Sequence, residues 1–308
     1  MSLAADPVHS LADLERLSFP GTALAVLGHP IQHSLSPAMH NAALAEMARS
    51  HPEFASWHYY RFEVHPDDLP GALDLFRARS FRGLNLTVPH KVIAFAHLKP
   101  DAPTVRMIGA VNTLLSKQPD GWESYNTDGY GLAMGVREDL GLSLENMPII
   151  LLGAGGAARG VGVECLQRRC ASLWVANRTR ARLEALLDVL RPLAGAVPLH
   201  GFDPQAPPAG LPAGALVINA TAAGLRPDDP PPVDLKRLPR PAGVYDMIYN
   251  PPATLLLRQA DALGLPCANG LLMLAHQGAK SLEIWSGAPA RLTAPTMLHA
   301  ARAALGSS

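Results

Sequence analysis

Three observations predict an α/β protein with two domains, an N-terminal α/β domain with a mostly parallel sheet and a Rossmann-like domain. Short apolar stretches of strand length alternate with longer helical patterns along the chain. One stretch, Ile149–Leu152, runs directly into the glycine-rich segment G-A-G-G-A-A-R at 153–159, which is typical of the strand, turn and helix of a dinucleotide site. A chain of 308 residues is long enough for two hydrophobic cores.

The composition excludes several classes of protein. The 26 basic and 26 acidic residues balance, and no polybasic run occurs, so we expect neither nucleic acid nor a membrane surface as a partner. The three cysteines, Cys165, Cys170 and Cys267, have no metal-like spacing, so we expect no metal site and a reduced, cytoplasmic protein. The first twenty residues lack the apolar core of a signal peptide, and we expect them to form a loose arm.

The N-terminal part is expected to form a β-α-β-α-β unit with right-handed crossovers, which gathers the carboxyl ends of its strands at one edge. The strands are predicted at Thr22–Leu27, Trp57–Val64 and Phe81–Val88, and the helices at Ser36–Arg49 and Pro66–Arg79. Ser36 is the predicted N-cap, with Pro37 at the first helical position. Two further short strands, 110–116 and 121–126, would be joined by a turn around Pro119–Gly121, and a helix would run from about Asn126 to Leu140.

Polar side chains follow two of these strands. Ser34 and Ser36 lie between the first strand and a helix N-terminus, a place suited to a small carboxylate. Each also has a plainer reading, in which Ser36 only caps the helix and Ser34 only shapes the loop. Asn85, Thr87 and Lys91 belong to the third strand and its end, and would point toward the same edge.

Lys91 and Asp128 are the candidates for proton transfer. A lysine has an ordinary pKa of about 10.4, and near a carboxylate it stays charged. It could then polarise a ketone and donate a proton as the alkoxide forms, with Asp128 orienting it or sharing the proton. A surface lysine at a helix start and an ordinary N-cap aspartate are the plainer readings.

The glycine-rich segment is expected to hold the pyrophosphate of a dinucleotide. Gly153 allows a sharp turn, Gly155 lets backbone amides approach the phosphates, and Ala158 allows close packing of helix and strand. The next strand tip carries Asn177, Arg178 and Thr179 in place of an acidic residue. An arginine beside a hydroxyl suits a 2′-phosphate, so we expect NADP rather than NAD, unless Arg178 only caps the turn.

The rest of the chain continues the alternation of strands and helices. Strands are predicted at Ala215–Ala220 and Gly243–Met247, surface loops at Asp203–Pro212 and Arg226–Pro241, and helices at Thr254–Leu263, Leu271–Trp285 and Pro295–Leu305.

Nine motifs, taken together and in order, resemble the shikimate dehydrogenase family. They are H-S-L-S-P (33–37), N-L-T-V-P-H-K (85–91), G-A-V-N-T (109–113), N-T-D-G (126–129), G-A-G-G-A-A-R (153–159), N-R-T (177–179), I-N-A-T (218–221), Y-D-M-I-Y (245–249) and N-G-L-L-M-L-A-H-Q (269–277). The N-terminal arm and the segment 48–57 depart from the family's usual lengths.

The resemblance implies a substrate-binding domain, residues 1–127 completed by 270–308, an NADP-binding domain, residues 128–269, and a cleft between them. It implies that Lys91 and Asp128 are the catalytic pair. It implies substrate contacts at Ser34, Ser36, Asn85, Thr87, Asn112, Tyr249 and Gln277. It implies cofactor contacts at Gly153, Ala154, Gly155, Gly156, Ala157, Asn177, Arg178, Thr179, Thr221, Met247 and Gly270.

The activity implied is the NADP-dependent, reversible reduction of 3-dehydroshikimate to shikimate in chorismate and aromatic amino acid biosynthesis. A quinate/shikimate or aminoshikimate dehydrogenase is an alternative on the same scaffold. A non-catalytic NADP-binding regulatory protein is an alternative from another class, although it would be expected to lack Lys91 or Asp128. Whether the protein is a monomer or a homodimer stays open.

Overall fold

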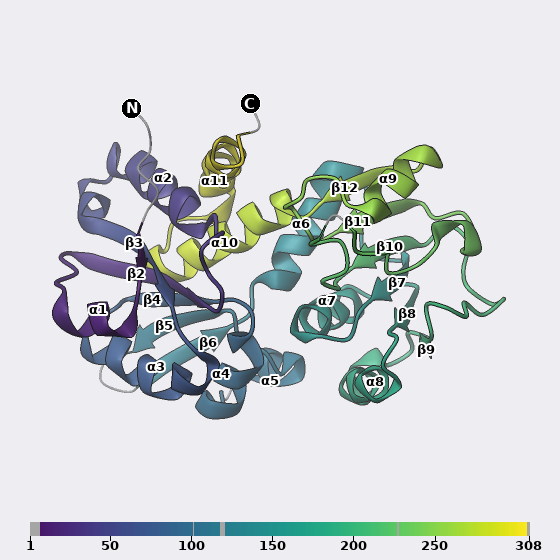
Figure 1. Cartoon of the computed structure of the whole chain (residues 1–308), viewed down its shortest axis with the longest axis horizontal. Helices are drawn as coiled ribbons and strands as arrows, with labels where there is room; N and C mark the ends of the chain where they lie inside the picture. The colour runs from purple at the N-terminus through teal and green to yellow at the C-terminus, as the bar shows by residue number, and fades with distance from the viewer. Residues whose placement is uncertain (1–6, 101, 118–120, 227, 307–308) are drawn as a thin grey trace. The chain divides into compact units, whose positions relative to one another are not determined.

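The structure, a computed structural model, describes residues 7–100, 102–117, 121–226 and 228–306. The chain divides into two compact units, unit 1 (Met1–Thr127 with Ala275–Ser308) and unit 2 (Asp128–Leu274). Each unit contains helices around a six-stranded sheet (Figure 1), which confirms the predicted α/β class. The central domain was predicted to end at residue 269, whereas this unit continues to Leu274, within a long helix.

The sheet of unit 1 has the strand order β1-β3-β2-β4-β5-β6. Its strands are β1 (Val8–His9), β2 (Thr22–Gly28), β3 (Trp57–Glu63), β4 (Gly83–Leu86), β5 (Thr113–Lys117) and β6 (Gly121–Tyr125). The first four are parallel to one another, and β5 is antiparallel to both of its neighbours, β4 and β6. The predicted parallel arrangement of the first three long strands is therefore confirmed.

Alternation along the strands sends apolar side chains of unit 1 into a core on one face of the sheet. Phe62, Leu84 and Leu86 lie in this core with residues of the helices that cover it. These helices are α1 (Leu11–Arg16), α3 (Leu69–Ala78), α4 (His90–Leu98) and α5 (Pro103–Ile108).

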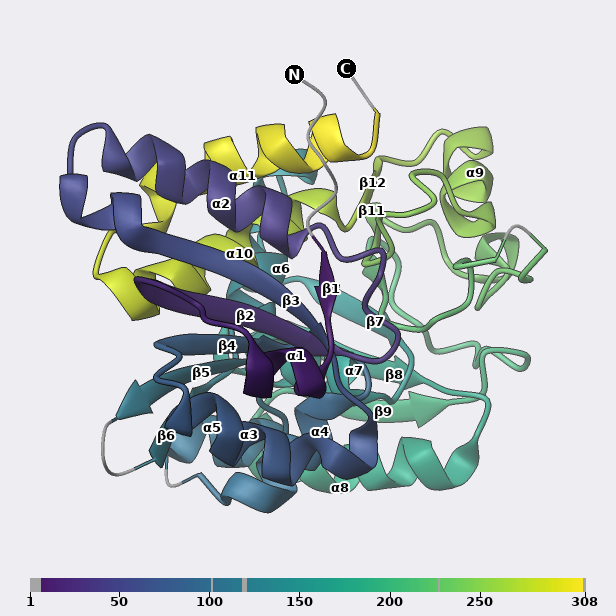
Figure 2. The ribbon, with the colours of Figure 1, turned by 60° about the vertical axis from the view of Figure 1, so that its left-hand side comes forward.

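The other face of the sheet carries polar residues among apolar ones. Tyr59 on this face is stacked on His40, and both rings contact Trp285. The covering helices are α2 (Ser36–Ala48), α10 (Leu271–Ser286) and α11 (Ala290–Ala304), of which α2 and α11 lie side by side (Figure 2). This face is where the predicted substrate residues of unit 1 gather.

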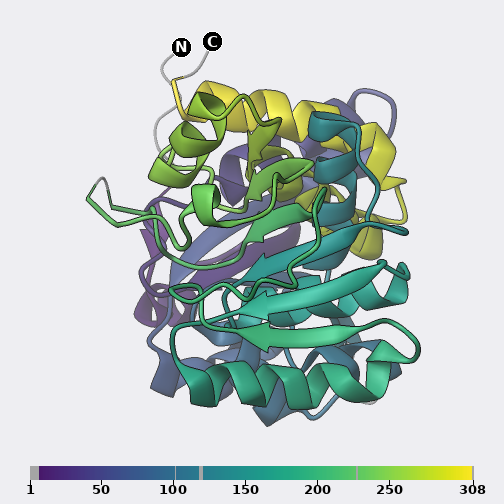
Figure 3. The same cartoon turned by 90° about the vertical axis from the view of Figure 1, so that its right-hand side faces the viewer.

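Unit 2 is a parallel sheet with the strand order β12-β11-β10-β7-β8-β9 (Figure 3). Its strands are β7 (Pro148–Leu152), β8 (Ser172–Ala176), β9 (Leu199–Phe202), β10 (Leu216–Asn219), β11 (Gly243–Asp246) and β12 (Cys267–Asn269), and its helices are α6 (Asp128–Leu140), α7 (Gly156–Gln167), α8 (Arg180–Ala194) and α9 (Leu255–Ala262). Every pairing in this sheet is parallel. In chain order this is the doubly wound order 3-2-1-4-5-6, whose direction reverses between β7 and β10.

The N-terminal arm was expected to be loose, and for residues 7–20 this is wrong. β1 pairs with β3, and α1 begins with a capping box in which the Ser10 and Asp13 side chains accept hydrogen bonds from each other's backbone N–H groups. Phe19 then packs its ring against Tyr60 and Phe62. The capping box is local, whereas the pairing of β1 and the ring contacts of Phe19 are made with β3 and depend on tertiary structure.

Several predicted boundaries shift. Ser36 is not the N-cap of α2: Leu35 is, without a side-chain cap, and Ser34 instead accepts a hydrogen bond from the Ser36 amide at 3.3 Å. The third strand is shorter than predicted, and the 3-10 turns Pro52–Ser56 and Leu235–Arg237 were not predicted. The helix predicted from Pro66 begins with a 3-10 turn, Pro66–Asp68, before α3. The last helix begins at Ala290 and includes Pro295. The turn predicted around Pro119 lies mostly outside the described residues.

Candidate functional site

The loop between β2 and α2 brings Ser34 and Ser36 together in unit 1. The Ser34 amide donates to the Ile31 carbonyl at 3.0 Å, and the Ser34 hydroxyl accepts from the Ser36 amide at 3.3 Å. Both serines therefore lie at the start of α2, where free backbone N–H groups and the helix dipole favour an anion. This placement suits the predicted carboxylate site.

Two side chains of β3 that the sequence reasoning did not single out hold this loop. Arg61, which is 8% exposed, donates from Nη1 to the carbonyl oxygens of Gln32 and Ser34. Glu63 accepts from the Ile31 amide at 3.1 Å and lies 2.9 Å from Nδ1 of His29. An arginine among the aromatic residues of the strand W-H-Y-Y-R-F-E was the available signal.

A second part of the site is a polar cluster around Asn112. Its Nδ2 donates to Oγ1 of Thr127 at 2.9 Å and to Oε1 of Gln277 at 3.4 Å, and its Oδ1 accepts from the Thr127 amide at 2.9 Å. The structure thus brings Asn112 and Gln277, two predicted substrate residues, together from segments 165 positions apart.

Asn85 is buried beneath the same cluster. Its Nδ2 lies within hydrogen-bond distance of the Asn112 carbonyl, Thr113 Oγ1 and Ser281 Oγ, at 3.1, 3.1 and 3.0 Å, and its Oδ1 accepts from Tyr59 Oη at 2.7 Å. An amide of this kind has two donor hydrogens, so these partners account for its donor capacity. The described hydrogen bonds therefore give Asn85 a role in holding the cluster, and its contact with substrate stays a prediction.

The backbone around Thr87 and Lys91 is tied to neighbouring segments of unit 1. The Thr87 amide donates to the Leu27 carbonyl at 3.0 Å, and the Lys91 carbonyl accepts from the Val111 amide at 2.9 Å. Lys91 is the second residue of α4 and is half-buried. Asp128 begins α6 in unit 2 and is 4% exposed. The pairing of Lys91 with Asp128 stays a prediction.

The glycine-rich turn of unit 2 has the geometry that a dinucleotide requires. Gly153 has φ +111°, and a Cβ there would lie 3.0 Å from both the Ala220 carbonyl oxygen and Cγ2 of Thr221. The turn after β7 therefore packs against the end of β10, where the strand order reverses and where such sheets bind ligands. Gly155 is the N-cap of α7, and an added Cβ would meet nothing within 4 Å. Ala154, Gly156 and Ala157 lie in the same turn and are partly buried.

The tip of β8 leaves Arg178 accessible. The Asn177 side chain donates to the Thr179 carbonyl at 2.8 Å, which fixes the turn, and Arg178 and Thr179 are exposed. Thr179, not Arg178, is the N-cap of α8. No carboxylate within the described residues forms an ion pair with Arg178, so its guanidinium can receive a phosphate.

A buried carboxylate, that of Asp246, connects the ends of β10 and β11, next to the place where the strand order reverses. Asp246 accepts hydrogen bonds from Asn219 at 2.9 Å, the Ile248 amide at 3.1 Å and Thr254 at 2.6 Å. Burial raises the pKa of Asp246, while these donors oppose the shift. Asn219 in turn accepts from Thr221 Oγ1 at 2.7 Å, so the network fixes a predicted cofactor residue.

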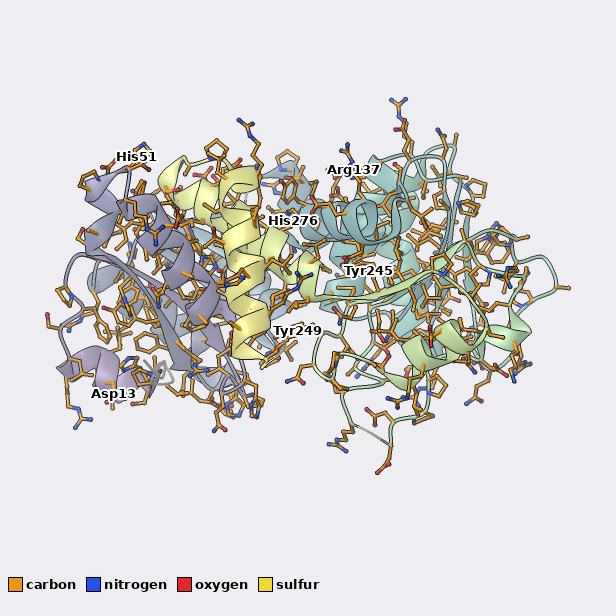
Figure 4. All side chains as sticks on the ribbon, turned by 90° about the horizontal axis from the view of Figure 1, so that it is seen from above. Asp13, His51, Arg137, Tyr245, Tyr249 and His276 are labelled. Atoms are coloured by element: carbon orange, nitrogen blue, oxygen red, sulfur yellow. The ribbon has the colours of Figure 1, made fainter. Side chains whose placement is uncertain are left out.

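Met247 and Tyr249 follow β11, and Gly270 follows β12, the neighbouring strand. A Cβ on Gly270 would lie only 2.1 Å from the Met247 carbonyl oxygen, so the two backbones are in close contact. Burial raises the pKa of Tyr249, which keeps its phenol protonated and able to donate a hydrogen bond. Tyr245, four residues earlier and also labelled in Figure 4, instead accepts a hydrogen bond from the Met273 amide at 3.3 Å.

Two negative findings concern only the described residues. Among them, no group of three or more His, Cys, Asp or Glu side chains could hold a metal ion. No helix formed by residues 7–100, 102–117, 121–226 and 228–306 is both long and apolar enough to cross a membrane.

Comparison with known proteins places these features in one family. A family model described as the shikimate dehydrogenase substrate binding domain matches residues 26–114. A protein of Symbiobacterium thermophilum named shikimate dehydrogenase (NADP(+)) is 40% identical over 272 residues, which cover 87% of this chain and 90% of that protein. One of the same name from Methanocella arvoryzae is 40% identical over 266 residues, with 86% and 93% covered.

Solved structures extend the similarity to three dimensions. The structure of shikimate 5-dehydrogenase from Thermus thermophilus, in complex with NADP(H) and shikimate, matches with a TM-score of 0.78 and 36% identity. The match covers 92% of this chain and 99% of that chain. The similarity therefore includes both units rather than one domain.

Proposed function

Because this chain belongs to the shikimate dehydrogenase family, we propose that it catalyses the NADP-dependent, reversible reduction of 3-dehydroshikimate to shikimate. The observation that carries the proposal is the nearly full-length match, at 40% identity over 87% of the chain, to a protein named for this activity and this cofactor. The family predicted from the nine sequence motifs is thereby confirmed.

In this proposal unit 1 holds the substrate. Ser34 and Ser36, at the N-terminus of α2, bind the carboxylate, because hydroxyl and backbone donors meet there. Asn112 and Gln277, which the structure brings together, bind the ring hydroxyls or the reacting oxygen with Asn85 and Thr87. Lys91 donates the proton to the substrate oxygen in reduction and accepts it in oxidation, and Asp128 orients the ammonium group. Tyr249 contributes from unit 2.

Unit 2 fits NADP, which supplies the hydride when bound. The turn from Gly153 to Ala157 and the N-terminus of α7 would hold the pyrophosphate. Arg178 and Thr179 would hold the 2′-phosphate, since both are exposed and the strand tip carries no acid. Thr221, Met247 and Gly270 would lie beside the nicotinamide ring. The proposal includes a cytoplasmic location and a place in aromatic amino acid biosynthesis.

The test is the initial rate of NADPH formation from shikimate and from quinate, each measured with NADP and with NAD. We expect fast turnover only with shikimate and NADP. Preference for quinate would assign the chain to the quinate/shikimate dehydrogenases, and preference for NAD would refute the role given to Arg178. Absence of turnover with every pair, in a protein that still binds NADP, would favour the non-catalytic alternative.

A further inference from the structure

One hydroxyl of α10, that of Ser281, lies at the centre of the polar cluster of unit 1. Ser281 is fully buried and stands one helical turn after Gln277. A serine inside a helix commonly points to solvent or donates only to the carbonyl four residues earlier. Ser281 makes this bond, to the Gln277 carbonyl at 3.0 Å, but the bond is only one of its contacts.

The further contacts of Ser281 connect α10 with other segments of unit 1. Its Oγ accepts a hydrogen bond from Nδ2 of Asn85, on β4, at 3.0 Å. The same oxygen lies 2.8 Å from Oγ1 of Thr113, the first residue of β5, and 3.3 Å from Oγ1 of Thr127. A hydroxyl has one hydrogen and two lone pairs, so these neighbours use its hydrogen-bonding capacity in full.

The hydrogen bonds next to Ser281 determine which way the side-chain amide of Asn112 faces. The backbone amide of Thr127 can only donate, and it donates to Oδ1 of Asn112 at 2.9 Å. The Thr113 hydroxyl donates to the same oxygen at 2.9 Å. Nδ2 of Asn112 therefore faces Gln277 and donates to its Oε1 at 3.4 Å. The orientation of one predicted substrate amide thus sets the orientation of the other.

Ser281 supports this pair of amides by two routes. Its single hydrogen has two acceptors, the Gln277 carbonyl and Oγ1 of Thr113. The first contact holds the backbone of Gln277, and the second supports the hydroxyl that Thr113 directs at Asn112. Members of a buried hydrogen-bond network polarise one another, so the loss of one hydroxyl weakens its neighbours as well.

We propose that Ser281 is a positioning residue, which holds the amides of Asn112 and Gln277 in the orientation that recognises the ring oxygens of the substrate. The inference rests on the proposed function, since that function assigns these two amides to the substrate. The ligand class that the arrangement favours is a small ring with several hydroxyl groups, over the same ring with one hydroxyl removed.

The experiment is a double-mutant cycle of Ser281→Ala, Gln277→Ala and the variant that carries both substitutions. Ser286→Ala is the matched control, because Ser286 belongs to the same helix and makes the same kind of bond, to the Leu282 carbonyl at 2.7 Å, but belongs to no predicted site. Titration calorimetry gives the Kd of shikimate and of the two deoxy analogues that each lack one ring hydroxyl other than the reacting one. Initial rates give kcat and KM.

We expect Ser281→Ala to raise the Kd and KM for shikimate about five- to tenfold, the effect of one or two buried hydrogen bonds, with kcat and the KM for NADP changed less than about threefold. The preference for shikimate over at least one deoxy analogue should fall, because loosely held amides reject a missing hydroxyl less strongly. In the Gln277→Ala background the same substitution should raise the Kd at most about threefold, since one of the amides it positions is gone.

Three results would overturn the inference. They are an unchanged Kd for shikimate in Ser281→Ala, an equal effect of this substitution with and without the Gln277 side chain, and an equal loss in Ser286→Ala. If Ser281→Ala does not fold, Ser281→Cys, which keeps the volume and offers a weaker donor, replaces it in the same cycle.

Failure of the inference and failure of the proposed function give different results. If the unsubstituted protein binds shikimate but does not oxidise it, the proposed function fails, and the binding cycle still decides the role of Ser281. If it binds no shikimate, both proposals fail together. Normal turnover of shikimate with an unaffected Ser281→Ala variant removes only the role given to Ser281.

Discussion

The imidazole of His40 lies flat against the phenol of Tyr59, with ring centroids 4.1 Å apart and planes 2° from parallel. Both side chains are fully buried. Neither ring nitrogen of His40 has a hydrogen-bond partner within the described part of the chain. Burial lowers the pKa of His40 from its ordinary value of 6.5 to about 3. The ring is therefore neutral in the folded protein, and a bound proton would have to be buried without a partner.

The burial of His40 predicts that the stability of the folded protein depends on pH. Below a pH of about 6.5 the unfolded chain binds a proton at His40 that the folded protein does not, so the free energy of unfolding should fall as the pH decreases toward about 3. The slope from this residue is at most about 1.4 kcal/mol per pH unit, and above a pH of about 6.5 it vanishes. Denaturant unfolding of the native protein and of His40→Phe, at a pH of about 7, 6 and 5, measures it.

His40→Phe keeps an aromatic ring opposite Tyr59 and removes the titration. The difference in unfolding free energy between the two proteins should therefore shift in favour of the variant as the pH falls. His90, whose pKa is also lowered by burial, is present in both proteins and cancels. Parallel pH profiles would show that His40 does not titrate in this way.

Lys91 is predicted to be needed for proton transfer and not for cofactor binding. Lys91→Ala should lower kcat by about 10² to 10⁴-fold, the usual contribution of a general acid, while the Kd for NADPH stays within about twofold. Fluorescence titration of NADPH measures the second quantity. Lys117→Ala is the control, because the ammonium of Lys117, an exposed residue of unit 1, forms an ion pair with Glu123 at 2.8 Å and belongs to no predicted site. Normal turnover of Lys91→Ala would refute the assignment.

Substitution by alanine should have different effects on stability at two glycines of unit 2, Gly155 and Gly270. A methyl group at Gly155 meets nothing within 4 Å, so Gly155→Ala should leave the unfolding free energy within about 1 kcal/mol. It would nevertheless occupy the position where the pyrophosphate approaches the backbone, so the KM for NADP should rise about tenfold.

Gly270→Ala should instead destabilise the fold. Its methyl group would lie 2.1 Å from the Met247 carbonyl oxygen, and because this atom belongs to the backbone it cannot rotate away. We expect a loss of about 2 to 3 kcal/mol, measured by denaturant unfolding. If Gly155→Ala proved the less stable of the two, the local packing described for these turns would be wrong.

Thr254 is predicted to be a main support of the buried Asp246. Thr254→Val removes the 2.6 Å hydrogen bond to that carboxylate and the side-chain cap of α9, which accepts from the Leu257 amide. Leaving a buried carboxylate short of a donor and losing a helix cap should together cost about 3 kcal/mol. Thr254→Ser keeps the hydroxyl and should lose less than half of that. Equal losses in the two variants would show that the hydroxyl does not give the support assigned to it.

Much of the fold could be predicted because its determinants are local. The apolar run Ile149–Leu152 predicts a strand, and the glycine after it predicts a turn, because glycine readily adopts a positive φ. Both are found, and Gly153 has a positive φ. The parallel pairing in both sheets follows from the alternation of strands with helices. The strand tip at Asn177–Thr179 could be identified by its distance from the glycine-rich turn.

The remaining features depend on contacts between distant segments. Ser36 is a residue type that favours N-caps, but Leu35 is the N-cap of α2, and the Ser36 amide donates a hydrogen bond to the Ser34 hydroxyl. Asn85 stays a predicted substrate residue, but the hydrogen bonds of its amide with Tyr59 of β3 and Ser281 of α10 could not be predicted from the sequence. Arg61 belongs to no motif, and it donates hydrogen bonds to backbone carbonyls of Gln32 and Ser34, whose positions no pattern of side chains encodes.

The short strand β1 changes the position of β3 within its sheet. Val8 and His9 pair with Arg61 and Phe62, so the carboxyl-terminal part of β3 is hydrogen-bonded on both sides, by β1 and by β2. An unpaired strand at a sheet margin frays readily and can recruit another chain. In this sheet β1 pairs with the exposed side of β3. The amides around Arg61 should therefore exchange with deuterium at the slow rate of a sheet interior.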